Sequence, residues 1–376
     1  MVMMTGFWQG KKVFLTGHTG FKGSWLSLWL TSLGAEVTGL SLSPNTQPSL
    51  FEQLGLVNHL NHHLGDIRDA DLVAKLIHQA RPDIVFHLAA QPLVRSSYVE
   101  PVETWNINVI GTIHVLEGLK KLDYPCAAVF ITTDKCYENK EWVYGYREND
   151  PLGGHDPYSS SKAGAELAIT SWRKSFFSKA DCSVGIASAR AGNVIGGGDW
   201  SKDRIVPDAM RSLIRDEPIP VRNPQATRPW QHVLEPLAGY LQVAESIYQC
   251  LSSADQLNQK DKFCSAFNFG PDLTSNRSVK ELVSEILNYW SGTWLDKSDP
   301  CAFHEASLLN LVTDKAYHLL NWKPLWDFEK TIRETVVWYR ESCEFSSSDY
   351  QRFQELSLLQ IKNYESILST NNINQI

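Results

Sequence analysis

Two residues of the run "YSSSK" have the types and the spacing that proton transfer to and from an alcohol requires. Tyr158 and Lys162 are four residues apart, and positions i and i+4 share one face of a helix. A tyrosine has an ordinary pKa of about 10 and is a poor base at neutral pH, so a neighbouring ammonium group must stabilise its phenolate. Such a pair takes a proton from an alcohol while a hydride leaves the same carbon.

A second group of candidate residues ends the apolar run "VFITTDKCYEN". If this run is a strand of a parallel sheet, the side chains that follow it face the ligand crevice. Thr133 is placed there to hydrogen-bond to the reacting alcohol, and Asp134 and Lys135 add an acid/base pair for a second proton transfer. We therefore predict five catalytic residues, namely Thr133, Asp134, Lys135, Tyr158 and Lys162.

The run "VFLTGHTGFKG" predicts a dinucleotide-binding loop. Its three glycines directly follow an apolar segment and precede a helical pattern, where they allow a tight turn and a close approach of the backbone to pyrophosphate. The spacing is G-x-x-G-x-x-G rather than the commoner G-x-G-x-x-G. The predicted loop contacts are Gly17, His18, Thr19, Gly20, Phe21, Lys22 and Gly23.

The choice between NAD and NADP stays open in the sequence. The second apolar segment ends at Ser41 instead of the acidic residue that commonly binds the adenosine ribose of NAD, and Lys22 is an alternative partner for a 2′-phosphate. Further cofactor contacts are expected where later strands end and on the helices beside them. They are Ser41, Asp66, Ile67, Leu88, Ala89, Ala90, Asn108 and Thr132, together with Tyr158 and Lys162.

The chain before Arg190 alternates apolar segments with helical patterns. Strands are expected at 11–17, 35–42, 83–90, 126–133 and 182–190, and helices at 23–34, 69–82, 101–122 and 159–177. Because continuous apolar strands alternate with helices, we predict an α/β protein with a doubly wound, Rossmann-type parallel sheet. A smaller, mixed α/β substrate-binding lobe follows it.

The predicted domains are interleaved. Residues 1–190, with returning segments at about 229–270, form the dinucleotide-binding domain, and residues 191–228 and 271–345 form the substrate-binding lobe. Residues 346–376 read as a polar, helix-prone tail that is either an oligomer contact or loosely held. The helices at 101–122 and 159–177 resemble the dimer-forming helices of the family described below, and this resemblance implies a homodimer or a dimer of dimers.

Composition excludes several classes of protein. The chain of 376 residues has a formal net charge of −7, which argues against a nucleic-acid-binding face. The start has no signal-peptide pattern and no apolar run is long enough to span a bilayer, so we expect a cytoplasmic protein without a membrane partner. Seven scattered cysteines without a C-x-x-C pair argue against a disulfide framework or a zinc site.

A phosphorylated substrate needs cationic and amide donors, and the second half of the chain supplies them. Arginine suits bidentate contacts with phosphate oxygens. Candidate contacts of this kind are Asn193, Arg204 and Arg228, with His87 and Arg95 as candidates for the lining of the same pocket. The family resemblance described next is what selects Asn193 and Arg228 as substrate contacts.

Five runs together resemble the extended short-chain dehydrogenase/reductase superfamily, and within it the nucleotide-sugar 4,6-dehydratases. They are "TGHTGFKG", "HLAAQPLVRSSY", "NINVIGT", "TTDKCYEN" and "YSSSK". The resemblance runs from about Phe7 to Tyr339. The combination of "GFWQGKKVFLTGHTGFKGSWL" with "TTDKCYEN" is similar to those members that act on CDP-glucose. The resemblance implies tightly held NAD, CDP-glucose as substrate and a role in deoxysugar biosynthesis of the O-antigen type.

The resemblance also implies a mechanism. Tyr158 would deprotonate the sugar 4-hydroxyl as hydride passes to NAD, and Asp134 would protonate the departing 6-hydroxyl. Many relatives have glutamate, the base for carbon 5, where this chain has Lys135; the lysine is a base, a ketone polariser or an orienter of Asp134. An Asp-Lys pair also occurs in UDP-N-acetylglucosamine 4,6-dehydratases. These enzymes, and other UDP- or dTDP-sugar dehydratases and epimerases, are therefore the alternative enzymatic assignment. The non-enzymatic alternative is a dinucleotide-sensing regulator.

Overall fold

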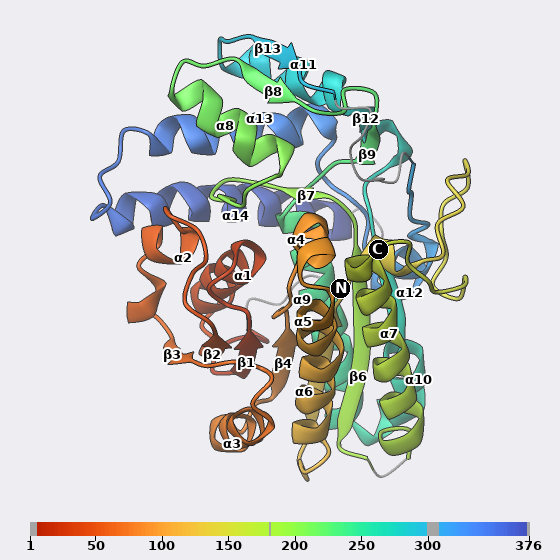
Figure 1. Cartoon of the computed structure of the whole chain (residues 1–376). Coiled ribbons are helices and arrows are strands. Elements are labelled where there is room, and N and C mark those ends of the chain that lie inside the picture. Colours follow the sequence, from red (N-terminus) through yellow and green to blue (C-terminus); the bar gives the residue numbers. More distant parts are fainter. Residues whose placement is uncertain (1–5, 180–181, 299–307, 374–376) are drawn as a thin grey trace.

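A computed structural model of the chain describes residues 6–179, 182–298 and 308–373. Its centre is a seven-stranded, all-parallel sheet in the order β3-β2-β1-β4-β5-β6-β11 (Figure 1). The strands are β1 (Lys12–Thr16), β2 (Glu36–Ser41), β3 (Asn61–Leu64), β4 (Ile84–His87), β5 (Cys126–Ile131), β6 (Val184–Ala191) and β11 (Ala266–Phe269). The predicted doubly wound fold is confirmed.

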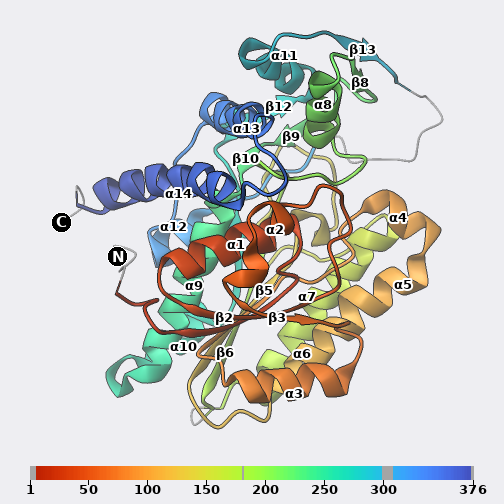
Figure 2. The ribbon, with the colours of Figure 1, turned by 90° about the vertical axis from the view of Figure 1, so that its left-hand side faces the viewer.

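Both faces of the sheet are covered by helices, because successive side chains of a strand point to opposite faces. In β1, Val13 and Leu15 pack into the core under α1 (Phe21–Ser32) and α9 (Leu234–Ser252), and Phe14 packs on the other side. That other side is covered by α3 (Ala70–Ala80), α6 (Gly111–Leu119) and α7 (Pro157–Phe176) (Figure 2). Every residue of β5 is buried, as expected for a central strand.

The predicted helix at 101–122 is not one regular helix. It consists of α5 (Pro101–Trp105), a π-helical turn η2 (Asn106–Ile110) and α6, and α4 (Val94–Val99) precedes it. The predicted helix at 159–177 is α7, which begins two residues earlier because Asp156 caps it by accepting a hydrogen bond from the Ser159 amide at 2.9 Å. Two further short helices, α2 (Leu50–Gln53) and α10 (Lys260–Phe263), lie beside the sheet.

Smaller elements form a second layer above the carboxyl ends of the strands (Figure 1). They comprise the short strand pairs β7–β10, β8–β13 and β9–β12 and the helices α8, α11 and α13. Their bounds are β7 (Val194–Ile195), α8 (Ile205–Ile214), β8 (Ile219–Val221), β9 (Thr227–Pro229), β10 (Gln231–His232), β12 (Asn276–Ser278), α11 (Val279–Tyr289), β13 (Trp294–Asp296) and α13 (Phe328–Ser342). Helix α12 (Asp314–Leu320) packs against α9 and the edge strand β11. The exact domain boundaries stay a prediction.

The C-terminal helix α14 (Tyr350–Ile373) is packed against the body of the protein (Figure 2). Its Tyr364 hydroxyl donates to Glu235 Oε2 at 2.7 Å, and its Glu365 accepts from the Trp29 indole at 2.8 Å. The predicted helical propensity of this segment is confirmed, and the suggestion of a loosely held tail is wrong for its described residues. In the described ranges, no helix combines the length and apolarity needed to cross a bilayer.

Candidate active site

A cavity of about 2060 Å³ lies between the carboxyl ends of the sheet and the second layer. It opens where β1 and β4 lie side by side, which is the point where the strand order reverses and where α/β proteins bind ligands. Pockets for one small ligand measure roughly 300–1,000 Å³, so this cavity has room for two. The predicted site residues that line it are Gly17, Thr19, Gly20, Phe21, Lys22, Gly23, Ser41, Asp66, Ile67, Leu88, Ala89, Ala90, Arg95, Thr132, Thr133, Asp134, Lys135, Tyr158, Lys162, Asn193, Arg204 and Arg228.

The catalytic candidates form a hydrogen-bonded chain at the end of β5. The Thr133 side chain is hydrogen-bonded to Tyr158 and donates to Asp134 Oδ1 at 2.9 Å. The start of α7 is fixed by a hydrogen bond from the Tyr158 amide to Ser97 Oγ at 3.1 Å. The structure therefore brings the two sequence runs together, as their predicted placement requires.

One oxygen of Asp134 has no hydrogen-bond partner among the described residues. The side chain is 1% exposed, and its Oδ2 is buried at the cavity wall. Lys135 Nζ lies 3.8 Å from the other oxygen, Oδ1. A buried carboxylate oxygen without a donor is costly, so packing alone does not explain an aspartate in the lining of the cavity.

The charges of Tyr158 and Lys162 depend on their burial. Burial raises the pKa of Tyr158 to about 12, and the hydrogen bond to Thr133 opposes this rise. Burial lowers the pKa of Lys162 to about 8, and the Glu166 carboxylate opposes this fall. Lys162 Nζ donates to the Ile131 carbonyl oxygen at 3.4 Å, which holds the ammonium beneath the end of β5.

The glycine loop has the shape that a pyrophosphate needs. A Cβ at Gly17 would lie 2.6 Å from the Ala89 amide nitrogen, and a Cβ at Gly23 would lie 2.1 Å from the Gly17 carbonyl oxygen. Helix α1 begins after Gly20, which has no side chain to cap the first amide groups. These amides and the positive end of the helix form a site for an anion, and the donor set fits a dinucleotide.

Lys22 is electrostatically coupled to charged groups at the catalytic end of the cavity. Burial and the neighbouring Arg204 lower its pKa to about 7, and Asp134 opposes this fall. This coupling favours a role of Lys22 beside the catalytic residues over one as a partner for a ribose 2′-phosphate.

At the end of the cavity beside β2, two predicted contacts are already engaged with the protein. Ser41 Oγ is hydrogen-bonded to Thr19 Oγ1 at 2.7 Å. Asp66 forms an ion pair with Arg68 at 2.6 Å, and hydrogen bonds from Arg68 lower the pKa of Asp66. The lining segments 41–47 and 65–67 include no lysine or arginine.

Two predicted histidine contacts do not line the cavity. The His18 ring points away from the glycine loop and is hydrogen-bonded to His62 Nδ1 at 2.6 Å. His87 is hydrogen-bonded to Thr16 at 2.7 Å and Thr112 at 3.0 Å, between the sheet and α6. Burial lowers the pKa of each histidine to about 3, so both are neutral structural residues.

Asn108 is also a structural residue rather than a cavity residue. Its side chain, in the π-helical turn η2, accepts from the Gln91 amide at 2.8 Å and donates to Ser161 Oγ at 2.8 Å. It thus ties the segment after β4 to the catalytic helix α7. The predicted cofactor contact at Asn108 is therefore wrong in this structure, and its neighbour Ile107 lines the cavity instead.

The second layer gives the cavity a basic wall. Arg204 is paired with Asp199 at 3.0 Å, and Asp203 pairs with both Arg95 at 3.7 Å and Arg222 at 2.5 Å. Three further arginines line the cavity and were not predicted from the sequence, namely Arg211, Arg215 and Arg222. A signal was available, because Arg211 and Arg215 are four apart on and just after α8 and so share a face.

No cluster of three or more potential metal ligands is found within the described ranges. The lining of the cavity supplies amides, hydroxyls, carboxylates and cationic side chains. This composition suits phosphate esters and sugar hydroxyls.

Comparison with known proteins identifies the family. The sequence profile described as GDP-mannose 4,6 dehydratase matches residues 14–335, which is most of the chain. The chain belongs to this family. It is 49% identical over 341 residues to the CDP-glucose 4,6-dehydratase of Salmonella typhimurium, and the match covers 89% of this chain and 92% of that protein. The predicted family and the prediction of an enzyme are confirmed.

More distant relatives share the same fold. The dTDP-glucose 4,6-dehydratase of Xanthomonas campestris is 25% identical, over 86% of this chain and 92% of that protein. An epimerase structure from Methanothermobacter thermautotrophicus superposes with a TM-score of 0.74 at 21% identity, over 92% of this chain and 97% of that one. A dTDP-glucose 4,6-dehydratase structure from Bacillus anthracis, solved in complex with NAD, superposes with a TM-score of 0.70 at 21% identity. This match covers 89% of this chain and 97% of that one.

Proposed function

We propose that this protein is a lyase that converts CDP-glucose to CDP-4-dehydro-6-deoxyglucose and water, with NAD as a bound cofactor, in deoxysugar biosynthesis. The observation that carries the proposal is the chain from Tyr158 through Thr133 to Asp134, which ends in an unpaired carboxylate oxygen. The 49% identity to an enzyme named for this reaction supports the sugar nucleotide. UDP- and dTDP-sugars are the alternative substrates.

The residues of the cavity fit NAD better than NADP. A 2′-phosphate needs a cation, and the segments 41–47 and 65–67 provide no lysine or arginine, while the adjacent Arg68 is already paired with Asp66 and Glu103. Ser41 and Asp66 would border the adenosine ribose, and the amides at the start of α1 would hold the pyrophosphate. When bound, NAD accepts hydride from sugar carbon 4 and returns it to carbon 6.

The residues of the chain account for the proton transfers. Tyr158 accepts the proton of the sugar 4-hydroxyl, and the ammonium of Lys162 on the same helix stabilises the phenolate. The 4-ketone acidifies the hydrogen on carbon 5, and a base, for which Lys135 is the candidate, takes this proton and returns it to carbon 5 when the hydride reaches carbon 6. Asp134, in its protonated form, donates a proton to the 6-hydroxyl, which departs as water. An epimerase has no leaving hydroxyl and no need for this acid, which favours the dehydratase.

Lys135 is placed to act on Asp134. Its Nζ lies 3.8 Å from Asp134 Oδ1, and its side chain is 28% exposed, so it remains partly in contact with solvent. A cation at this distance helps to fix the orientation of the Asp134 side chain. We infer that Lys135 orients Asp134; base for carbon 5 and ketone polariser are its alternative roles.

The basic wall is placed to hold the diphosphate and the base of the substrate. Arg222 and Arg228 line the cavity on the second layer, and Asn193 lies just after β6, where the two layers meet. Arginine pairs bidentately with phosphate oxygens, and Asp203 and Asp208 keep the Arg222 guanidinium group in place before the substrate binds.

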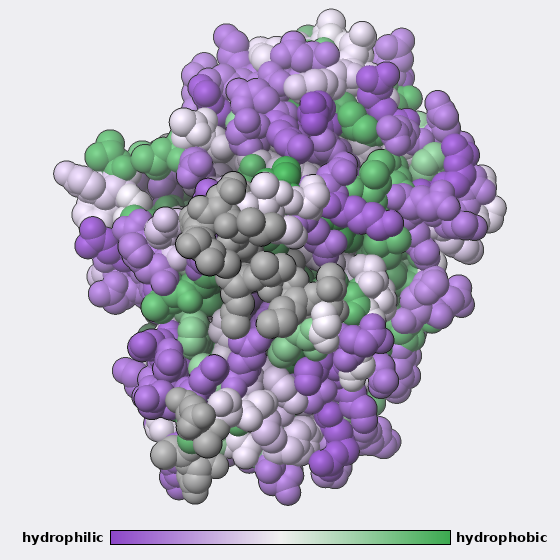
Figure 3. Space-filling view, turned by 180° about the vertical axis from the view of Figure 1, so that it is seen from behind, coloured by the Kyte–Doolittle hydropathy of each residue, from purple (hydrophilic) through white to green (hydrophobic). Residues whose placement is uncertain are grey.

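We infer that the protein is at least a homodimer through the face formed by α4, α5, η2 and α7 (Figure 1). Five apolar side chains on these adjacent elements are exposed, namely Val99, Val102, Trp105, Ile110 and Leu167. The opposite side of the molecule is mainly hydrophilic outside the grey residues (Figure 3). An exposed patch of apolar side chains of this kind is suited to pack against the same patch of a second copy of the chain.

The described cysteines support a cytoplasmic location. Cys126, Cys136, Cys182, Cys250, Cys264 and Cys343 are all free thiols. Free thiols persist in reducing compartments.

The decisive experiment is incubation of the purified protein with CDP-glucose and, in parallel, with UDP-N-acetylglucosamine, UDP-glucose and dTDP-glucose, with NAD and without a reductant. Loss of one water from CDP-glucose, detected by mass, is the expected result. Loss from another sugar nucleotide alone would keep the chemistry and change the substrate. No loss from any of them, with NAD bound, would overturn the proposal and favour a dinucleotide-sensing regulator.

A further inference from the structure

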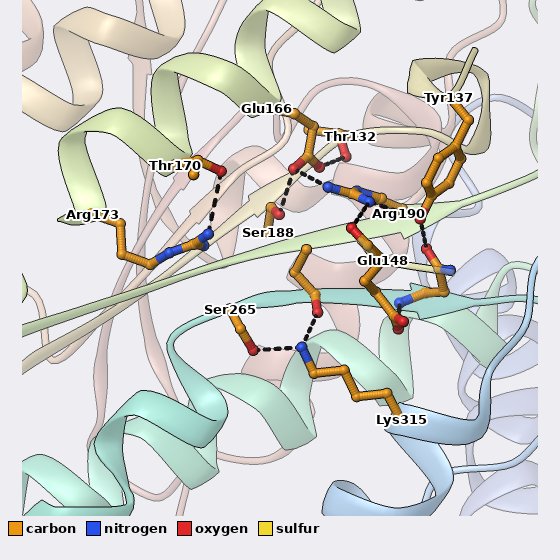
Figure 4. A network of polar contacts seen from close by, with 12 residues as sticks. Thr132, Tyr137, Glu148, Glu166, Thr170, Arg173, Ser188, Arg190, Ser265 and Lys315 are labelled. Carbon is orange, nitrogen blue, oxygen red and sulfur yellow. Dashed lines mark hydrogen bonds and ion pairs between the residues drawn. The ribbon is translucent and has the colours of Figure 1, made fainter. Parts of the chain in front are cut away.

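A fully buried carboxylate lies behind the catalytic residues, one turn along α7 from Lys162. Glu166 accepts hydrogen bonds from three side chains (Figure 4). Its Oε1 accepts from Thr132 Oγ1 at 2.5 Å, and its Oε2 accepts from Ser188 Oγ and Arg190 Nη2, both at 2.8 Å. All four side chains are at least nine-tenths buried, so this is a dry ionic network rather than a surface ion pair.

Arg190 extends this network to the loop that follows the catalytic strand. Its Nη1 donates to the Tyr137 hydroxyl at 2.7 Å and to the Glu148 carbonyl oxygen at 2.9 Å (Figure 4). Burial of an ion pair costs desolvation energy, and apolar replacements are often as stable or more stable. Stability alone is therefore a weak explanation for the Glu166–Arg190 pair. Its position next to the catalytic residues points to a functional explanation.

Glu166 is connected to both elements that carry the catalytic side chains. Thr132, which donates to it, directly precedes Thr133 and Asp134 in the chain. On the helix side, Lys162 and Glu166 are four residues apart on α7 and share a face. The Lys162 ammonium in turn reaches the Ile131 carbonyl oxygen of the same strand, so the helix and the strand end are joined twice.

Four titratable groups from different elements face Lys162. They are Glu166 on α7, Cys136 in the 3₁₀ turn η3 (Asp134–Cys136), His87 on β4 and Lys22 in the glycine loop. Burial raises the pKa of the Cys136 thiol and lowers that of His87 to about 3, so both are neutral. The pKa of Glu166 is lowered: burial by itself would raise it, but Arg190 and the hydroxyl donors Thr132 and Ser188 outweigh burial. Of these four groups, Glu166 is therefore the one anion.

We propose, resting on the function proposed above, that Glu166 is a positioning residue of the active site, whose carboxylate fixes the end of β5 through Thr132 and supplies the counter-charge that keeps Lys162 an ammonium ion. It does not touch the substrate and acts through these two neighbours. Lys162 loses its charge at high pH, and the phenolate of Tyr158 then loses its stabilising cation. The carboxylate thus sets the upper end of the active pH range.

The first test is the pH dependence of kcat for Glu166→Gln, which keeps the shape of the side chain and removes its charge. Without the carboxylate, the pKa of Lys162 falls below about 8, and the high-pH decline of kcat moves down by about one pH unit. At a pH above both midpoints this corresponds to a loss of about tenfold in kcat, whereas on the low-pH plateau the variant and the wild type should differ by less than about twofold. KM for CDP-glucose stays near the wild-type value, because Glu166 does not line the cavity.

A second readout needs no substrate. The lysine side chains are labelled with ¹³C at Cε, and the Lys162 resonance is assigned by its loss in Lys162→Arg. Its chemical shift is followed against pH in the NAD-bound wild-type protein and in NAD-bound Glu166→Gln. We expect a lower titration midpoint in the variant. If the wild-type enzyme lacks dehydratase activity but this midpoint moves, the proposed reaction is wrong and the role of Glu166 stands.

Two further variants separate charge from structure. Ser188→Ala removes one hydrogen bond to Glu166 and keeps the carboxylate, so both pH readouts should stay in place. The double variant Glu166→Gln/Arg190→Met avoids a buried unpaired guanidinium if the single variant does not fold, and it should show the same downward shift. An unchanged Lys162 midpoint in the folded single or double variant would overturn the proposal.

Discussion

The carboxylate of Asp134 occupies the space that a side chain at Gly192 would need. A Cβ at Gly192 would lie 2.8 Å from Asp134 Oδ2 and 3.4 Å from Pro229 Cγ. The glycine comes directly after β6, and the aspartate follows β5, the neighbouring strand. The acid that we assign to the dehydration step is thus held in a pocket whose size depends on a residue without a side chain.

This contact predicts that Gly192→Ala lowers activity by displacing Asp134. The atom that must move is the end of a side chain, so the fold should lose little stability. A displacement of the acid by about 1 Å costs about a hundredfold in rate when geometry is decisive. We expect kcat for CDP-glucose dehydration to fall by about that factor, measured by mass, with an unfolding midpoint close to that of the wild type.

A matched control is Gly118→Ala in α6. Its new Cβ would also meet the end of one flexible side chain, Ile77 Cδ1 at 2.9 Å. Neither Gly118 nor Ile77 lines the cavity. Its kcat should equal that of the wild type. Equal losses of activity in the two variants would show that Gly192 acts through general packing and not through Asp134.

Asp134→Asn should separate the hydride step from the loss of water. The amide keeps the shape of the side chain and cannot donate the proton that the 6-hydroxyl needs. General acid catalysis is worth about 10²- to 10⁴-fold, so we expect product formation to fall within that range. Reduced cofactor should accumulate on the enzyme and be visible by its near-ultraviolet absorbance. Full product formation without such accumulation would remove Asp134 from the dehydration step.

The backbone of the site was predictable because it follows from periodic patterns. The strand at 126–133, the glycine loop at 17–23 and the helix that carries Tyr158 and Lys162 were placed correctly, and the parallel fold brings their ends together. Side-chain direction was harder. His18 and His87 lie in the predicted segments, but their rings turn into the protein to reach His62 and Thr112.

Contacts between distant segments were beyond the sequence patterns. The role of Gly192 depends on Asp134, which is 58 positions away in the chain, and the packing of α14 depends on Trp29 and Glu235 from other layers. The segment at 346–376 looked polar because its apolar residues are spread along a helix that is buried on one side only. The proximity of Glu166 to Lys162 could have been predicted, since the two residues are four positions apart in a predicted helix.

The exposed apolar face on α4, α5, η2 and α7 predicts that Val102→Asp weakens the dimer. Val102 is 72% exposed in the single chain, so the change should leave the fold intact. A carboxylate buried without a partner in the interface should raise the dissociation constant by about a hundredfold or more. Sedimentation analysis at low micromolar protein measures this. Val57→Asp, at a residue that is 53% exposed on another element, should leave the dimer unchanged.

Tyr364→Phe should lower stability more at high pH than at low pH. Burial raises the pKa of Glu235 to about 7 from an ordinary value of 4.5, and the Tyr364 hydroxyl opposes this rise by donating to Oε2. An acid with a raised pKa in the folded state gives stability that is fully present below pH 4.5 and is lost as the pH rises through about 7. Above that pH the folded protein contains a buried carboxylate that needs its donors.

Removal of the hydroxyl therefore costs most when Glu235 is ionised. We expect the free energy of unfolding to fall by about 1.5–3 kcal/mol at about pH 8, the value of a hydrogen bond to a charged group, and by about 0.5–1.5 kcal/mol at about pH 5. Urea unfolding at both pH values measures the difference. Tyr350→Phe, at a 44% exposed residue of the same helix, should change neither value by more than about 0.5 kcal/mol. Equal losses at both pH values for Tyr364→Phe would show that the Glu235 charge does not depend on this hydroxyl.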